Sequence, residues 1–325
     1  MSLETEIIDR ATKGKATRLS FGEELASLGA KYDEVVALDA DLSKSTMTML
    51  FAEKFPKRFF NAGIAEANMI GMAAGLAAAG KIPFAASFGC FLTGRYDQIR
   101  MSVAFTGANV RLVGTHAGVG IGEDGHSQMA LEDLTLMRSL PNMTVFQPAD
   151  DYDTRAFMNW SMGHQGPIYM RLTRQALPVL KRANLRPFAP GRWDLLTALH
   201  ESSIVVLASG ALVEASIQAA DLLARLGPVT FINANWIKPI DEELLLKAVQ
   251  SKPKLFVTIE DHYRIGGLGG AIAEKLSEWK MSAPLLRIGV EGFGQSGSPA
   301  ANYEHYGFTP RALAGQIEKA LSAGQ

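Results

Sequence analysis

The chain has 325 residues, of which 47% are hydrophobic and 20% are charged, and its formal net charge at pH 7 is −1. These values are typical of globular proteins and provide no basic field that would attract nucleic acid. Even the apolar run from Ile64 to Ala79 is interrupted by Glu66 and Asn68, so no segment is predicted to span a bilayer. We therefore expect neither a nucleic-acid nor a membrane partner.

The cysteine content and the first residues bear on cellular location. Cys90 is the only cysteine, which excludes an internal disulfide and is typical of a reducing cytoplasm. The start, Met-Ser-Leu-Glu-Thr-Glu, lacks the basic and apolar regions of a signal peptide. We expect a cytoplasmic protein in which Cys90 is a small packing residue.

The first half of the chain alternates strand-like and helix-like runs. Short apolar runs predict strands at residues 35–39, 82–87, 110–115, 143–147 and 168–172. Helical patterns between them cover residues 21–32, 96–105 and 130–139. Buried strands that alternate with helices favour a parallel sheet with helices on both faces.

Residues 175–203 break this rhythm, because they contain three prolines and have no sustained period. We interpret them as the crossing to a second domain. Strands are predicted there at residues 204–210, 229–233, 255–260 and 285–290, and helices at 211–226, 241–250, 270–279 and 310–321. The glycine cluster at residues 266–270 fits the Gly-x-Gly-x-x-Gly dinucleotide motif poorly. The predicted fold class is α/β, with two α/β domains and mostly parallel sheets.

The segment from Asn61 to Gly80 carries one carboxylate near its start, Glu66, among small and apolar residues. A carboxylate buried in such a helix is costly without a partner, and burial favours its protonated form. A proton held there could be donated to the ring nitrogen of a bound ligand. On this segment alone the simpler interpretation is favoured, in which Glu66 stabilises its own helix terminus.

The motifs that follow reverse that preference. Phe88 and Phe91 come after one predicted strand and Thr115-His116 after the next, followed by Gly122-Glu-Asp-Gly125 and Thr173-Arg174-Gln175. Together with the run Gly-Ile-Ala-Glu that ends at Glu66, this order resembles the pyrimidine-binding domain of transketolase, a thiamine-diphosphate enzyme. The resemblance is closest to split transketolases, in which the C-terminal half is a separate chain, and it extends from about Ala16 to the C-terminus.

The resemblance implies the domain organisation and a cofactor site. It implies a thiamine-diphosphate pyrimidine-binding domain at residues 12–175, a linker at 176–200 and a transketolase C-terminal domain at 201–325. Glu66 would donate to the aminopyrimidine ring nitrogen of thiamine diphosphate, and Phe88 and Phe91 would bracket that ring. Without the resemblance, core filling explains the two phenylalanines about equally well.

The resemblance also implies a site for a sugar phosphate. Arg18, Ser45 and Arg174 would grip the phosphate, because arginine forks and hydroxyl groups suit a dianion. The alternative for the arginines is ordinary solvated surface charge. His116 and Asp124 would face the substrate hydroxyls, with His116 acting catalytically as a proton shuttle near neutral pH.

The glycine-rich loop at residues 114–125 has two notable features. Its five glycines indicate a backbone that closely approaches another group. Transketolases usually have a histidine four residues after the Gly-Glu-Asp aspartate, whereas this chain has Gln128 there and a histidine at His126. Because glutamine cannot carry a proton, either the donor sugar is unusual or His126 takes the vacant role. We expect both side chains in the substrate site.

The magnesium ligands of this family, a Gly-Asp-Gly motif and a later asparagine, are not found at the expected spacing. Magnesium requires hard oxygen ligands. We therefore expect them on a partner, an N-terminal transketolase subunit that traps the cofactor against this chain. The family implies a heterotetramer with two copies of each chain, and this chain alone is expected to be inactive.

Three functions are compatible with these motifs. The first is the C-terminal subunit of a split transketolase, a transferase that moves a two-carbon ketol unit between a ketose phosphate and an aldose phosphate. The second is the beta subunit of a 2-oxoacid dehydrogenase, which the order His126-Ser-Gln128 favours, although a phosphate grip would be idle there. The third is a non-catalytic scaffold, which would leave Glu66 without a purpose. The sequence favours the first.

Overall fold

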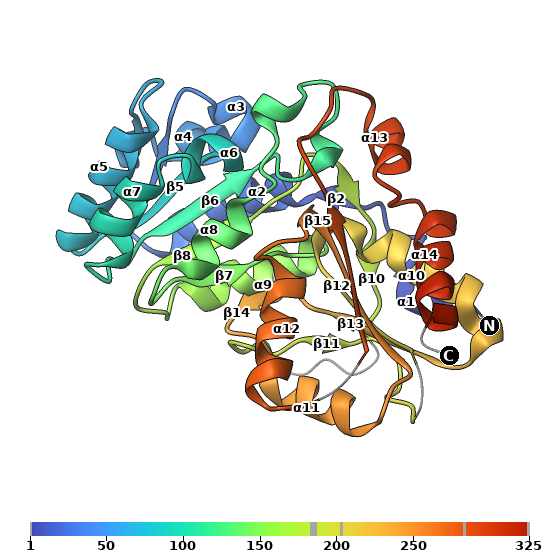
Figure 1. Ribbon diagram of the computed structural model, residues 1–325. Helices are drawn as coiled ribbons and strands as arrows, with labels where there is room; N and C mark the ends of the chain where they lie inside the picture. Colours follow the sequence, from blue (N-terminus) through green and yellow to red (C-terminus); the bar gives the residue numbers. More distant parts are fainter. Residues whose placement is uncertain (1, 183–186, 202–203, 282–283, 324–325) are drawn as a thin grey trace.

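The computed structural model describes residues 2–182, 187–201, 204–281 and 284–323. Two α/β domains lie beside each other, the first at the upper left of Figure 1 and the second at the lower right. Each domain is built on a mostly parallel sheet, so the predicted fold class is confirmed.

The first domain is built around a seven-stranded sheet. Its strand order is β14 (Trp236–Lys238), β7 (Thr144–Phe146), β8 (Ile168–Arg171), β6 (Arg111–Thr115), β5 (Ile82–Phe88), β3 (Val35–Asp39) and β4 (Phe59–Asn61). All neighbouring strands are parallel except β14, which runs antiparallel to β7. Every residue of β3 and β6 is buried, as expected of a sheet covered on both faces.

The helices of the first domain connect these strands. They are α2 (Thr17–Lys31), α3 (Ser43–Thr46), α4 (Met49–Lys54), α5 (Glu66–Ala78), α6 (Gly89–Thr93), α7 (Tyr96–Ile99), α8 (Asp133–Ser139) and α9 (Asp151–Ser161). The predicted helix at residues 96–105 is divided, because α7 continues as a π-helical turn at Arg100–Ala104.

The second domain contains a five-stranded sheet in the order β11 (Asp194–Leu195), β13 (Val229–Asn233), β12 (Ile204–Ala208), β15 (Leu255–Tyr263) and β16 (Leu285–Val290). Only β11 is antiparallel to its neighbour. The helices are α10 (Val213–Leu223), α11 (Glu242–Gln250), α12 (Leu268–Glu278), α13 (Pro299–His305) and α14 (Pro310–Ala323). Part of the predicted linker thus forms an edge strand of this sheet.

The chain passes between the domains several times. The N-terminal helix α1 (Leu3–Ile7) packs against α10 of the second domain, so both chain ends lie there in Figure 1. β1 (Ile8–Asp9) pairs with β10 (Val179–Leu180), and β2 (Lys15–Ala16) pairs with β9 (Ala176–Leu177). Since β14 follows β13 in the sequence but joins the first sheet, the two domains are interlocked.

A buried polar cluster joins the two sheets. Arg171 Nε donates to the carboxylate oxygens of Asp133 at 2.9 and 3.1 Å, and the Tyr169 hydroxyl donates to the same carboxylate at 2.6 Å. Arg171 Nη2 also donates to the carbonyl oxygen of Asp261, in β15, at 2.7 Å. Breaking a buried ion pair such as Arg171–Asp133 costs about 3–5 kcal/mol. This pair holds Arg171 in the first domain, and the hydrogen bond from Arg171 to Asp261 joins it to the second domain.

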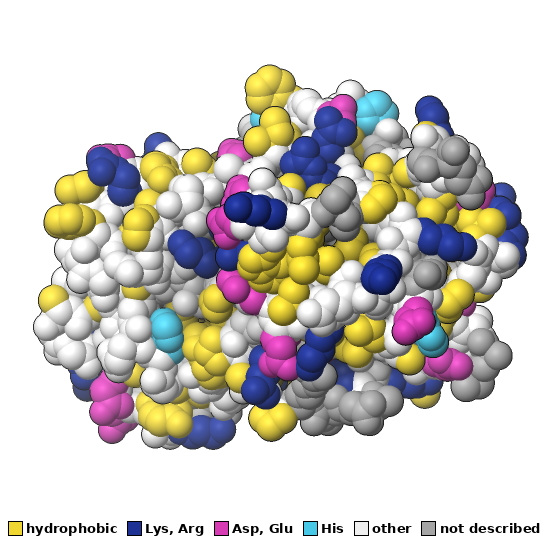
Figure 2. All heavy atoms as spheres, turned by 60° about the horizontal axis from the view of Figure 1, so that its bottom comes forward, with side chains coloured by type: hydrophobic (Ala, Val, Ile, Leu, Met, Phe, Trp, Pro, Cys, Tyr) yellow, Lys and Arg dark blue, Asp and Glu magenta, His cyan; other side chains and the backbone are white. Residues whose placement is uncertain are grey.

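The surface carries mixed charge. On the face shown in Figure 2, Lys and Arg side chains alternate with Asp and Glu side chains around apolar patches, without a field of one sign. Among the described residues, no helix combines the length and the apolar character needed to cross a membrane.

Candidate active site at the carboxyl edge of the first sheet

The predicted site residues gather at one edge of the first sheet. Ser45 follows β3, Glu66 follows β4, Phe88 ends β5, His116 follows β6 and Arg174 follows β8. Because these strands are parallel, their carboxyl ends meet at the same edge, where ligands bind in open α/β sheets.

Two arginines are brought to this edge by a pair of threonines. The Thr173 N–H donates to Thr17 Oγ1 at 2.8 Å, and the two hydroxyl oxygens lie 3.1 Å apart. The next residues are Arg18 and Arg174, and burial together with repulsion from Arg174 lowers the pKa of Arg18. Among the described residues, the buried Nε of Arg18 has no hydrogen-bond partner. An anion at this point would relieve the repulsion between Arg18 and Arg174 and accept a hydrogen bond from the Arg18 Nε–H group.

Ser45 is placed by a buried aspartate in the preceding strand. Asp39 accepts hydrogen bonds from the Leu42 N–H at 2.5 Å, the Thr46 hydroxyl at 2.7 Å and the Thr48 hydroxyl at 3.0 Å. Burial raises the pKa of Asp39. These bonds fold the turn after β3, and the carbonyl oxygen of Ser45 accepts from Arg18 Nη1 at 2.6 Å. Arg18 therefore contacts the backbone of Ser45.

His116 connects the arginines to the aromatic pair. Its ring stacks on Phe88 with centroids 3.9 Å apart, and Phe88 stacks on Phe91 at 5.6 Å with an interplanar angle of 6°. Burial, reinforced by Arg18 and Arg174, lowers the pKa of His116 to about 3. Burial in this position favours the neutral imidazole near pH 7, and the role of His116 as a proton shuttle stays a prediction. The neutral ring can donate or accept a hydrogen bond.

Glu66 is the first residue of α5 and is only 6% exposed. Its helix contacts β5 and α6, the elements that carry Phe88 and Phe91. No hydrogen bond or ion pair joins its side chain to another described residue, and no side chain caps this helix terminus. A buried carboxylate without a protein partner fits a ligand that carries a basic ring nitrogen. The aminopyrimidine of thiamine diphosphate meets this requirement.

The glycine-rich loop brings Asp124 to the arginines. An Asp124 carboxylate oxygen lies 3.6 Å from Arg174 Nη1, and the same Nη1 donates to the carbonyl oxygen of Ile121 at 2.7 Å. Both charged side chains are partly exposed, so this ion pair leaves them open to a ligand. The structure thus unites Arg18, His116, Asp124 and Arg174.

His126 and Gln128 lie in the 3₁₀ turn His126–Gln128, which contacts α6. His126 Nδ1 accepts from the Gly294 N–H at 3.0 Å, and its ring packs edge-on against Phe293 at 4.7 Å. These contacts hold His126 against the second domain. The Gln128 side chain makes no hydrogen bond to a described residue. Its amide group is therefore available to a ligand, whereas the His126 ring already has two protein contacts.

Some contributors to the site were not predicted. Thr17 and Thr173 carry a signal in the sequence, because each precedes an arginine in a Thr-Arg pair. Asp39 carries a weaker one, as the only charged residue of a buried strand. Asp261 accepts from the Val119 N–H at 2.9 Å across the domain boundary, and no local pattern could reveal that contact.

The glycine cluster at residues 266–270 does not form a phosphate loop. The Glu260 carboxylate accepts from the N–H groups of Leu268 at 2.7 Å and Gly269 at 2.9 Å, at the start of α12. Burial raises the pKa of Glu260 to about 7. The protein's own side chain therefore takes the place that a nucleotide phosphate would need.

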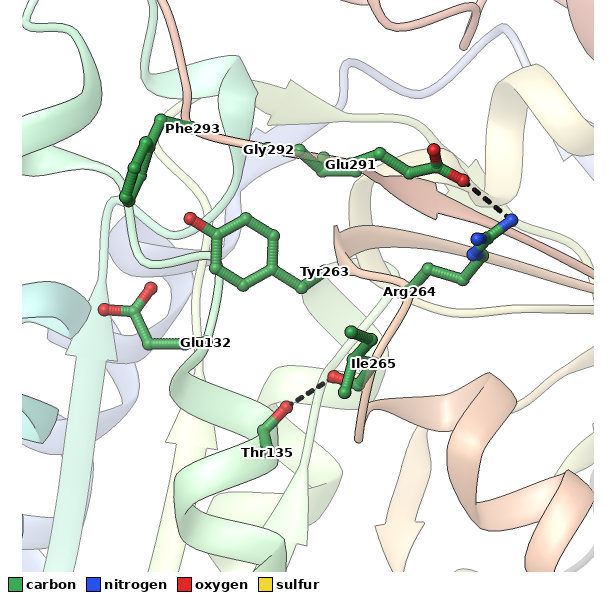
Figure 3. Close-up of a pocket in the computed structure, with 9 residues that line it drawn as sticks. Glu132, Thr135, Tyr263, Arg264, Ile265, Glu291, Gly292 and Phe293 are labelled. Carbon is green, nitrogen blue, oxygen red and sulfur yellow. Dashed lines mark hydrogen bonds and ion pairs between the residues drawn. The ribbon is translucent and has the colours of Figure 1, made fainter.

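A cavity of about 570 Å³ lies at the junction of the domains, and one of its lining residues, Phe293, packs against the predicted site residue His126. Figure 3 shows Tyr263, Phe293 and Glu132 on one side of it and the Arg264–Glu291 ion pair, at 2.7 Å, on the other. None of the sequence-predicted site residues lines it.

The described residues contain no group of three or more His, Cys, Asp or Glu side chains placed to hold a metal ion. The side chains at the sheet edge include two arginines, which suit an anion, and His116, Phe88 and Phe91, which suit an aromatic ring. Ser45 and the carboxylates of Glu66 and Asp124 lie at the same edge.

Comparison with known proteins agrees with this arrangement. Residues 13–179 match the family described as transketolase, pyrimidine binding domain, and residues 193–313 match transketolase, C-terminal domain. The paired domains and the relatives below define a transferase subunit. The chain belongs to the transketolase family.

Its relatives include split and full-length proteins. A putative transketolase C-terminal section from Methanocaldococcus jannaschii is 42% identical, covering 93% of this chain and 95% of that protein. The 6-deoxy-6-sulfo-D-fructose transketolase subunit SqwH from Clostridium sp. is 39% identical, covering 89% of each. Human transketolase is 34% identical over 92% of this chain but only 48% of its own length. The chain thus resembles a split C-terminal subunit.

Solved structures show the same fold. A split-gene transketolase described as an inactive beta4 tetramer is 41% identical and superposes with a TM-score of 0.86, covering 96% of this chain and 100% of that one. The transketolase of Campylobacter jejuni, at 23% identity, superposes with a TM-score of 0.80 over 49% of its length.

The low pKa of His116 predicts how acid affects stability. In the unfolded chain a histidine takes up a proton below its ordinary pKa of 6.5, whereas native His116 stays neutral down to about 3. Stability is therefore present above pH 6.5 and is lost as the pH falls, by about 2 kcal/mol at pH 5 from this group. Between pH 7.5 and 5, we expect the free energy of unfolding of His116→Gln to fall about 2 kcal/mol less than that of the unmodified chain.

Urea denaturation at the two pH values measures this difference. His305→Gln, at an exposed position, is the matched control and should follow the unmodified chain. If His116→Gln showed the same pH dependence as the unmodified chain, the buried neutral state assigned to His116 would be wrong.

Proposed function

We propose that this chain is the C-terminal subunit of a two-chain transketolase, which transfers a two-carbon ketol unit from a ketose phosphate to an aldose phosphate. The observation that carries the proposal is the set of Arg18, Arg174 and neutral His116 directly beside the stacked Phe88 and Phe91. An anion site next to an aromatic-ring site matches a sugar phosphate that reacts on thiamine diphosphate.

Glu66, Phe88 and Phe91 are the residues that would hold the aminopyrimidine of the cofactor. When bound, thiamine diphosphate supplies a carbanion and an electron sink for breaking the carbon–carbon bond. Glu66 would form a hydrogen bond with a ring nitrogen of the aminopyrimidine through its carboxyl group, while the phenylalanine rings would exclude water from the aromatic faces. His116 and Asp124 orient substrate hydroxyls by hydrogen bonds, and the arginines fix the anionic end.

A partner subunit is part of the proposal. The chain spans about half of human transketolase, and the related split-gene structure is described as an inactive tetramer of one chain type. Near Glu66, Ile64 is 84% exposed, and Phe105 is 79% exposed in the segment after the π-turn that contacts α5. Exposed side chains of this size support a covering protein. We infer an N-terminal subunit that supplies the magnesium ligands, in a heterotetramer of two copies of each chain.

The role of Glu66 predicts a loss of activity without a loss of fold. Glu66→Gln removes the proton that the carboxyl group shares with the cofactor, so turnover with the N-terminal subunit and thiamine diphosphate should fall at least ~100-fold. The free energy of unfolding should change little, since no described residue bonds this side chain. The matched control is Glu53→Gln on the exposed side of α4, which should retain turnover. Turnover of Glu66→Gln within threefold of the unmodified complex would refute the role.

The anionic group of the donor sugar has two candidates, and the SqwH relative suggests the second. Phosphate and sulfonate are both tetrahedral groups with oxygens that two guanidinium groups can bind, but phosphate carries more charge. We propose a phosphorylated donor as the first candidate and a 6-deoxy-6-sulfo ketose as the second, since the relative is named for that substrate.

Kinetics with matched donors separates these candidates. With the reconstituted complex, Arg18→Met should raise KM for a ketose phosphate about 10- to 100-fold, because a charge-assisted bond in a partly buried site is lost. KM for hydroxypyruvate, which has no phosphate, should stay within twofold. A higher kcat/KM for the sulfo ketose than for the phosphate would instead select the second candidate. An equal rise in KM for hydroxypyruvate, which lacks both the phosphate and the sulfonate, would contradict a role of Arg18 at that end of the donor.

A further inference from the structure

The glycine-rich substrate loop is held by side chains of the second domain. Asp261, at 1% exposure, accepts from the Val119 N–H at 2.9 Å, and Asn302 Nδ2 donates to the Val119 carbonyl oxygen at 3.1 Å. Both backbone groups of Val119, which begins the 3₁₀ turn Val119–Ile121, are thus bonded to β15 and α13.

Two glycines of the loop, Gly118 and Gly120, show how closely the loop backbone approaches these side chains. A Cβ atom on Gly118, where φ is +87°, would lie 2.2 Å from Asp261 Oδ2. A Cβ atom on Gly120 would lie 2.2 Å from Gln175 Nε2 and 2.4 Å from the Tyr303 hydroxyl. The group that these glycines approach is therefore a cluster of side chains, largely from the second domain, and not a ligand.

The same cluster reaches Arg174 from two directions. The Tyr303 hydroxyl donates to Asp261 Oδ2 at 3.3 Å and accepts from Nε2 of Gln175, the residue next to Arg174. On the other side, Arg174 Nη1 donates to the carbonyl oxygen of Ile121, which ends the turn that Asp261 holds. Asp261 is therefore connected to Arg174 by two routes. One runs through Tyr303 to the neighbouring residue Gln175, and the other runs through the turn at Val119–Ile121 to the guanidinium group.

We propose that Asp261 and Tyr303 are positioning residues for Arg174, so that the second domain sets the affinity of the site for the anionic end of the substrate. This inference rests on the proposed function, because it takes Arg174 as a substrate contact. The effect is expected in KM for an anionic sugar, since neither side chain reaches Glu66, Phe88 or Phe91 by a hydrogen bond.

Removal of one hydroxyl group tests the proposal. In the complex with the N-terminal subunit and thiamine diphosphate, Tyr303→Phe should raise KM for a ketose phosphate about five- to tenfold, because one partly buried chain of hydrogen bonds is broken. The kcat value and the KM for hydroxypyruvate should stay within twofold. Tyr96→Phe is the control, because its hydroxyl bonds Ser139 within the first domain.

Arg174→Met, measured in parallel, separates the two hypotheses. If Arg174→Met raises KM for the ketose phosphate but Tyr303→Phe does not, the positioning role is wrong and the proposed site stands. If Arg174→Met also leaves KM unchanged, the anion site and the inference built on it both fail. Equal losses of kcat with both donors would show a merely structural role. Should Tyr303→Phe fail to assemble, Gln175→Met breaks the same chain at its other end and must give the same KM effect.

Discussion

The candidate site depends on one tertiary hydrogen bond, the Thr173 N–H to Thr17 Oγ1, between residues 156 positions apart. It fixes the start of α2 beside the end of β8 and so places two guanidinium groups in one partly buried region. Two like charges in such a region repel each other, and the lowered pKa of Arg18 reflects burial and this repulsion. The arrangement is stabilised when an anion lies between the arginines, which links a local feature of the fold to substrate binding.

The second domain contributes to this region by direct contact. In strand β15, the Asp261 carboxylate accepts a hydrogen bond from the glycine-rich loop, and the Asp261 carbonyl oxygen accepts one from buried Arg171. The same residue therefore contacts both the loop and the domain interface. The expected close approach of the loop glycines is present, but the neighbours are protein side chains. The second domain therefore holds the glycine-rich loop in place beside Arg174.

The sequence predicted the strands better than their contacts. The boundaries of β3 and β13 were predicted correctly, because continuous buried apolar runs have few alternatives. Helix α9 was missed because its polar first turn follows β7 closely, and β11 and β14 were missed because each depends on pairing with a distant strand. Motifs indicated which residue types form the site. That Arg18 would meet the carbonyl group of Ser45, and that His116 would be neutral, depends on burial and neighbours that no local pattern encodes.

The central claim is that Arg18 and Arg174 form one anion site at the carboxyl edge of the first sheet. A crystal structure of the two-chain complex with a bound ketose phosphate tests it most directly. The account predicts the phosphate within hydrogen-bond distance of both guanidinium groups, with the sugar directed towards His116. A phosphate bound elsewhere, with these two arginines facing solvent, would contradict it.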